Sequence, residues 1–120
     1  MADIEIAGNK LIVHIRGADK FFALASRLEV PVAHISDVEV NPAEAHQVWH
    51  GLRMGGTNLP GVITAGRFLQ GGQWAFWDVH DPSNSIAIYL HDESYARVVI
   101  GVSDPQAAAD AVAEAISAAS

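Results

Sequence analysis

Residues 63–102 read ITAGRFLQGGQWAFWDVHDPSNSIAIYLHDESYARVVIGV, and this stretch decides the fold class. Apolar, β-branched and aromatic residues gather here in four short runs separated by Gly-, Asp-, Ser- and Asn-rich clusters that favour turns. We therefore predict four short strands joined by short turns in an antiparallel meander. The expected strands are residues 63–69, 73–79, 85–91 and 97–102.

The segment before this meander, RMGGTNLPGV at residues 53–62, has three glycines and a proline. Glycine permits positive φ and proline fixes φ, so the segment is predicted to be a loop of defined shape. Thr57 and Asn58 are candidates to hydrogen-bond a small ligand, with Arg53 contacting an anion. Alternatively, Thr57 and Asn58 satisfy their own turn, and Arg53 pairs with one of the acidic residues.

Residues 42–50 are predicted to form a short helix, with Asn41 as N-cap and Gly51 as its stop. His46 and His50 are four residues apart on this helix, so both imidazoles can face one way and are weak candidates for metal ligands. The alternative is a solvated helix face. Two histidines do not complete a metal site, and we predict no metal and no cofactor.

The two ends of the chain complete the predicted fold. Residues 4–15 alternate around Gly8-Asn9 as a hairpin, and residues 17–26 suit a short helix. Residues 27–40 resume strand character, which Pro31 interrupts. Ser103-Asp104-Pro105 opens an alanine-rich helix that ends near residue 119.

About seven antiparallel strands followed by one C-terminal helix is the element order of a pleckstrin-homology-like (PH-like) barrel. The chain resembles the small stand-alone bacterial PH-like domains of unknown function. The resemblance implies one domain over residues 1–120, with two orthogonal sheets and a helix that closes one open end. It also implies protein interaction and symmetric self-association. The segments that carry it are GADKFFAL (17–24), LEVPVAHI (28–35), RMGGTNLPGV (53–62), FWDV (76–79) and DPQAAADAV (104–112).

The composition of the chain limits which classes of partner and which cellular location we expect. The chain has 120 residues, 50% of them hydrophobic, a formal charge of −7 and no cysteine. The acidic balance disfavours nucleic acid, phosphoinositides and membrane surfaces, which draw on clustered Lys and Arg. The first hairpin also lacks the second basic pair of phosphoinositide-binding PH domains. Without cysteine or a visible signal sequence, a cytoplasmic location is predicted.

The run Trp74-Ala75-Phe76-Trp77 places large aromatic residues on both faces of one strand. One face must therefore lie outside the barrel core, and an exposed aromatic patch marks an interface. Trp74 and Trp77 are accordingly candidate partner-binding residues. The alternative is that the loop at residues 53–62 or the terminal helix covers them.

No catalytic set emerges from the sequence. Asp78 and His80 share one side of a strand, as acid–base chemistry requires, but no nucleophile can be assigned to them, and Asp81-Pro82 is ordinary turn chemistry. We therefore predict a non-catalytic interaction module that binds a protein partner or itself as a homo-oligomer. The alternative is a small-molecule or metal binder, or an enzyme, that uses residues 53–61 with His46, His50 or His80.

Overall fold

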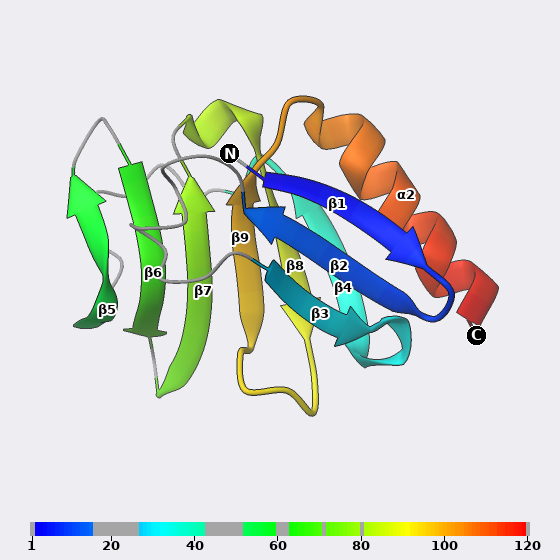
Figure 1. Cartoon of the computed structure of the whole chain (residues 1–120), viewed down its shortest axis with the longest axis horizontal. Helices are drawn as coiled ribbons and strands as arrows, with labels where there is room; N and C mark the ends of the chain where they lie inside the picture. Colours follow the sequence, from blue (N-terminus) through cyan, green and yellow to red (C-terminus); the bar gives the residue numbers. More distant parts are fainter. Residues whose placement is uncertain are drawn as a thin grey trace.

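The computed structural model describes residues 2–15, 27–42, 52–59, 63–70, 72–79 and 81–119. Two β-sheets and a C-terminal α-helix make up this part of the chain, so the protein is mainly β, as predicted (Figure 1). The helices predicted at residues 17–26 and 42–50 fall on residues outside the described ranges. None of the described helices is long and apolar enough to cross a membrane.

The first sheet has three antiparallel strands in the order β1-β2-β3. β1 (Ala2–Ala7) and β2 (Lys10–Ile15) form the predicted hairpin, and Gly8 takes the positive φ of 63° that its turn requires. β3 (Arg27–Pro31) pairs with β2. The alternating pattern buries Leu11 and Val13 on the inner face of the sheet.

β3 ends at Pro31, and the chain then passes from the first sheet to the second. Val32–His34 form a short 3-10 turn, η1, whose Val32 N–H donates to the Asn9 carbonyl at 2.8 Å. The chain then enters β4 (Ile35–Val40). The interruption predicted at Pro31 is therefore confirmed, but the two halves of residues 27–40 belong to different sheets.

The second sheet has six strands in the order β4-β8-β9-β7-β6-β5. Its other members are β5 (Leu52–Leu59), β6 (Ile63–Gln70), β7 (Gln73–Val79), β8 (Ser85–Leu90) and β9 (Arg97–Gly101).

The predicted antiparallel meander is wrong at its centre. β7 does not pair with β8; it pairs in parallel with β9, which lies between them. After β7, the chain passes through the 3-10 turn η3 (Pro82–Asn84) and enters β8, which pairs with β4. The physical reason is burial, since Val98, Val99 and Ile100 are all buried and need apolar neighbours on both faces of the sheet.

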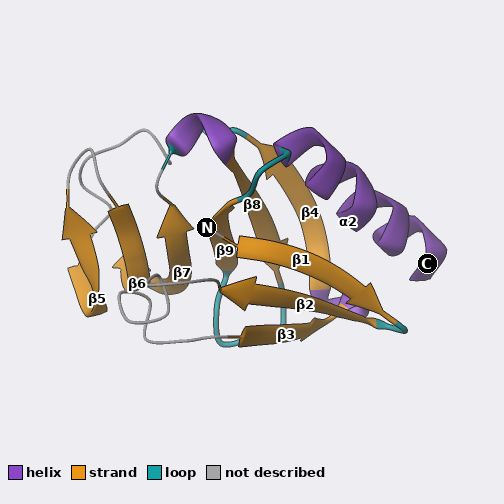
Figure 2. Ribbon diagram, turned by 45° about the horizontal axis from the view of Figure 1, so that its top comes forward, coloured by secondary structure: helices purple, strands orange, loops and turns teal. Residues whose placement is uncertain are grey.

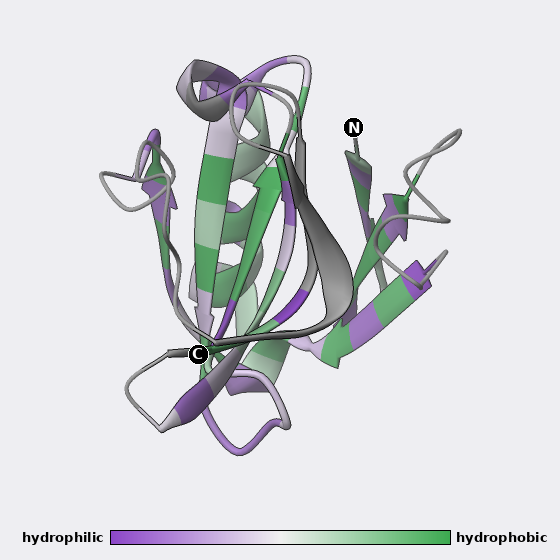
Figure 3. Ribbon diagram, turned by 90° about the vertical axis from the view of Figure 1, so that its left-hand side faces the viewer, coloured by the Kyte–Doolittle hydropathy of each residue, from purple (hydrophilic) through white to green (hydrophobic). Residues whose placement is uncertain are grey.

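Two apolar clusters lie on the two faces of the six-stranded sheet. The larger cluster fills the space between the two sheets and the helix, and it includes Phe76, Ile86 and Val112. The smaller cluster lies on the opposite face and includes Trp77 and Val99. Figure 3, which views the molecule from the side of β5, shows apolar residues concentrated in the central strands and the helix behind them.

The C-terminal helix α2 (Pro105–Ala119) begins and packs as predicted. Asp104 caps it, because its carboxylate accepts from the Ala107 N–H at 3.1 Å. Val112 is fully buried in the larger cluster, and Ile116 packs against that cluster. The helix lies mainly against β4, with further contacts to β1, β8 and η1 (Figure 2).

The two sheets do not close into a barrel. They share no ladder in the part of the chain that the structure describes, and β5 and β6 lie at the opposite end of the molecule from α2 (Figure 1). A barrel of seven antiparallel strands is therefore not what these residues form. The resemblance to PH-like domains predicts the two sheets and the terminal helix but not the open six-stranded sheet.

Candidate interaction surface

The predicted loop at residues 53–62 is a strand over most of its length. Leu52–Leu59 form β5, which pairs antiparallel with β6 from Leu52 opposite Leu69 to Leu59 opposite Ile63. The ladder shifts register between Met54 and Thr57, so the Gly55-Gly56 pair is a β-bulge rather than a turn. The loop prediction was wrong because glycine pairs accommodate bulges as readily as turns.

Arg53, Thr57 and Asn58 therefore lie on a strand at the edge of the sheet. In the described part of the chain, β5 has β6 as its one neighbour, because β5 is the last strand in the order. An edge strand presents backbone N–H and C=O groups that another strand can pair with. The register places Arg53 opposite Phe68 and Asn58 opposite Thr64, which puts both residues on the same face of the sheet.

Charge is distributed unevenly between this edge and the rest of the molecule. No acidic residue occurs between Glu44 and Asp78, although the chain carries fourteen elsewhere, and this stretch contains Arg53 and Arg67. The β5–β6 hairpin is thus the one part of the described sheet with two cations and no acid. A strand that approaches this hairpin meets no carboxylate on it.

The two candidate tryptophans of β7 have different environments. Trp77 is 0% exposed, and its ring meets that of Phe68 edge to face, with centroids 6.3 Å apart. Trp74, at the start of the strand, is partly exposed. Phe76 is buried on the opposite face from Trp77. Both faces of β7 are thus covered, and of the two tryptophans only Trp74 is accessible to a partner.

Trp74 borders a surface hollow of about 410 Å³ between the start of β7 and the loop after β8. Tyr95 also lines this hollow and packs edge to face on Phe76, with ring centroids 5.8 Å apart. Burial raises the pKa of the Tyr95 phenol, and the Arg67 guanidinium partly offsets this effect. Tyr95 was not predicted from the sequence, because the preceding residues Asp92-Glu93-Ser94 indicate only a turn.

Histidines gather beside this hollow. His34 Nδ1 lies 2.5 Å from a Glu93 carboxylate oxygen, and His91 Nδ1 lies 2.8 Å from the Ser36 hydroxyl. The two imidazole centroids are 5.8 Å apart. These contacts fasten the loop after β8 to η1 and the start of β4, so they have a structural role. No group of three or more His, Cys, Asp or Glu side chains within the described ranges could hold a metal ion.

Of the two acidic candidates Asp78 and Asp81, the first lies in the core and the second in a turn. Asp78 is 0% exposed and lies on β7 between Ala65 of β6 and Ile100 of β9. Asp81 serves the turn, as predicted, because its carboxylate accepts from the Ser83 N–H at 3.0 Å. His46, His50 and His80 lie outside the described residues, so neither the metal pair nor the Asp78–His80 pair has a described geometry.

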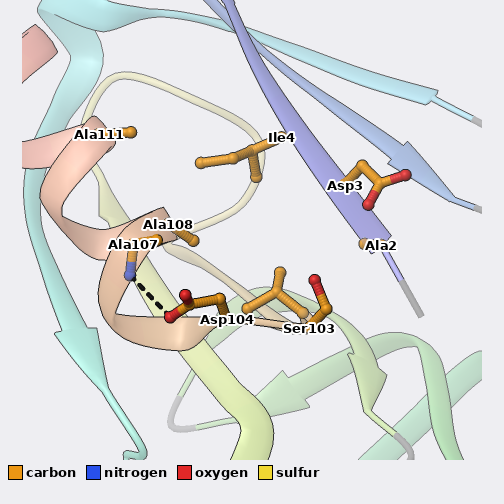
Figure 4. A pocket seen from close by; sticks show the side chains of 9 residues that line it. Ala2, Asp3, Ile4, Ser103, Asp104, Ala107, Ala108 and Ala111 are labelled. Atoms are coloured by element: carbon orange, nitrogen blue, oxygen red, sulfur yellow. Dashed lines mark hydrogen bonds between the residues drawn. The ribbon is translucent and has the colours of Figure 1, made fainter.

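A second hollow of about 260 Å³ lies between β1 and the first half of α2 (Figure 4). Its helix side is made of small residues, among them Ala107 and Ala111, and Ile4 points toward it from β1. Asp3 and Asp104 add carboxylates at the rim. The capping hydrogen bond of Asp104 already occupies the helix N-terminus here, so this hollow offers packing space rather than an anion site.

Comparisons with known proteins identify no relative of this chain. No family model matches the sequence, and neither a curated protein nor a solved structure matches it. The function must therefore be argued from the residues and the geometry alone.

Proposed function

We propose that this protein is a non-catalytic interaction module that binds an extended protein segment along the edge of β5. The observation that carries the proposal is the position of β5 at the end of the six-stranded sheet, with β6 as its one neighbour in the described chain. A segment that adds to such an edge gains main-chain hydrogen bonds, and side chains on alternate positions give it selectivity. Strand addition needs no catalytic residue and no cofactor.

The length and chemistry of β5 favour this role. Its eight residues, LRMGGTNL, include one charge and no acid. Lysine and acidic residues on an edge strand oppose pairing with other strands, and β5 has neither. The proposal keeps Arg53, Thr57 and Asn58 as binding residues but assigns them to a strand edge instead of a ligand-binding loop.

A phage-displayed library of random peptides, panned against the purified protein, tests this function. Selected peptides would be titrated into ¹⁵N-labelled protein, and amide chemical shifts would be followed by NMR. We expect the largest shifts on residues 52–59, with β1 and β2 unaffected. Peptides that bind elsewhere and leave the β5 amides unshifted would overturn strand addition at this edge.

The hollow beside Trp74 supports a second candidate function, the binding of a small molecule. Its volume of about 410 Å³ falls within the range of ligand sites, and two aromatic side chains border it. Native mass spectrometry of gently purified protein tests this candidate. Retained extra mass that is lost in Trp74→Ala would support it, and a bare subunit mass would count against it.

A further inference from the structure

We propose that the strand that completes the β5 edge is β5 of a second copy of this chain. The two strands would run antiparallel about a two-fold axis between Gly55 and Gly56. This inference rests on the proposed function, because it names the partner of the same edge. It gives the module a closed, symmetric dimer with a continuous sheet across the interface.

The first argument is the symmetry of the β5 sequence. Read about its central glycine pair, LRMGGTNL places a leucine at each end. In the symmetric antiparallel register Leu52 lies opposite the partner's Leu59. Arg53 then lies opposite the partner's Asn58, and Met54 lies opposite the partner's Thr57. At most one residue of each pair carries a charge, so no like charges lie opposite each other.

In an antiparallel pair, residues directly opposite each other lie on the same face of the sheet, and the bulge in β5 allows the symmetric register to meet this condition. Met54 and Thr57 are three residues apart, an odd spacing that would put them on opposite faces of a regular strand. They pair instead with Arg67 and Ala65, which are two residues apart on β6. The extra residue at Gly55-Gly56 thus returns both to one face. The same register places Arg53 and Asn58 together on the other face.

The alternative pairings are less favourable. A parallel in-register pair would set Arg53 beside the partner's Arg53, and like charges directly opposite each other are destabilising. A head-to-tail pair would join β5 to β4 of the next copy. The helix α2 packs against β4, and β4 carries the acidic residues Asp37 and Glu39. Both features oppose the addition of a strand there.

The absence of native cysteine allows a clean crosslinking experiment. The double variant R53C/N58C places two thiol pairs across the proposed dyad, and M54C/T57C places the next two pairs. Hydrogen-bonded and non-hydrogen-bonded pairs alternate, so one of these two variants has the closer Cα spacing that a disulfide needs. Each variant would be oxidised mildly and run on a non-reducing gel, after circular dichroism shows that it is folded.

The single variants R53C and N58C are the matched controls. In the proposed dimer, identical residues are separated by the span from Arg53 to Asn58, which the bulge reduces to four regular positions. This is about 14 Å, which is well beyond the roughly 7 Å Cα limit of a disulfide. We expect at least one double variant to give a disulfide-linked dimer at least tenfold more abundant than in either single variant. Equal crosslinking in singles and doubles, or none in any variant, would overturn the symmetric pairing.

Failure of this inference is distinguishable from failure of the proposed function. If neither double variant crosslinks but selected peptides still shift the β5 amides, the edge binds a different protein and the proposed function stands. If the double variants crosslink but no peptide binds at β5, the module is dedicated to self-association. If crosslinks form only between β5 and a cysteine introduced on β4, as in N58C/D37C, the assembly is head-to-tail and the symmetric dimer is wrong.

Discussion

The two edge strands of the six-stranded sheet, β4 and β5, differ in their charge and in what covers them. At one end, β4 carries Asp37 and Glu39 and lies against α2. At the other end, β5 carries no acid, and no described helix or strand lies beyond it (Figure 1). Acidic charge and a covering helix are two means of blocking an edge, so β4 is protected against strand addition in a way that β5, within the described residues, is not.

The buried centre of the sheet separates these two ends, and the largest expected effect is there. Trp77→Ala removes a fully buried indole that packs against Phe68, which should cost about 3–5 kcal/mol of unfolding free energy. Trp74→Ala, on the same strand but partly exposed, should cost less than about 2 kcal/mol. Urea denaturation measures both. Equal losses would show that the two tryptophans are not divided between core and surface.

The closed end should weaken when its helix loses its cap. Asp104→Ala removes the acceptor of the Ala107 N–H, and we expect a loss of about 1 kcal/mol in the free energy of unfolding. Asp110→Ala is the control, because this exposed carboxylate on the same helix only accepts from the Gln106 side chain at 2.9 Å. Its effect should stay within about 0.5 kcal/mol. A cap variant as stable as the control would contradict the assigned helix start.

The open end should respond to charge in association rather than in folding. In the proposed dimer, Asn58→Glu would place a carboxylate opposite the partner's Arg53 twice, whereas Asn58→Lys would place a like charge there. With about 0.2–1 kcal/mol per cross-strand pair, the dimer should tighten or weaken by about 2- to 30-fold, respectively. Sedimentation equilibrium measures the dissociation constants. Changes of the same sign for both variants would contradict the register, and R53E/N58K should restore the affinity that Asn58→Lys loses.

The smallest expected effect is at high pH, in the loop that joins β8 to β9. Burial raises the pKa of Tyr95 in the folded protein, so the folded state holds the phenol proton more tightly than the unfolded chain does. The corresponding stability is fully present below pH 10, the ordinary pKa of tyrosine, and is lost as the pH rises through the folded value. Thermal melts between pH 9 and 11 should therefore fall more steeply for the native protein than for Tyr95→Phe. Identical slopes would argue against a raised pKa for the partly buried phenol of Tyr95.

The contrast between local and long-range features also explains what the sequence could predict. The hairpin around Gly8, the interruption at Pro31 and the helix start at Asp104-Pro105 depend on neighbouring residues, and all three were predicted correctly. The parallel pairing of β7 with β9 joins segments about twenty residues apart and depends on burial. The continuous apolar run Val98 to Ile100 was the available signal for a central strand.

The candidate surface shows the same limit. Gly55-Gly56 was interpreted as a turn because glycine is permissive, yet permissiveness alone does not distinguish a bulge from a loop. Pairing with β6 decides between them, and this pairing is a tertiary fact. The stretch without acidic residues between Glu44 and Asp78 was visible in the sequence and would have identified the distinctive edge. Arg53, Thr57 and Asn58 were predicted to bind a ligand from a loop, and the structure places all three on the edge strand β5.

Hydrogen exchange of the β5 amides, followed by NMR in dilute and in concentrated protein, tests whether β5 is an open edge that a second copy completes. We expect alternate amides of residues 52–59 to exchange freely in the dilute protein, since an edge strand bonds to its one neighbour with every second residue. In concentrated protein these amides should become protected, while those of β8 and β9 stay unchanged. Full protection of every β5 amide in the dilute monomer would show that the edge is already completed within one chain, and it would contradict the open edge.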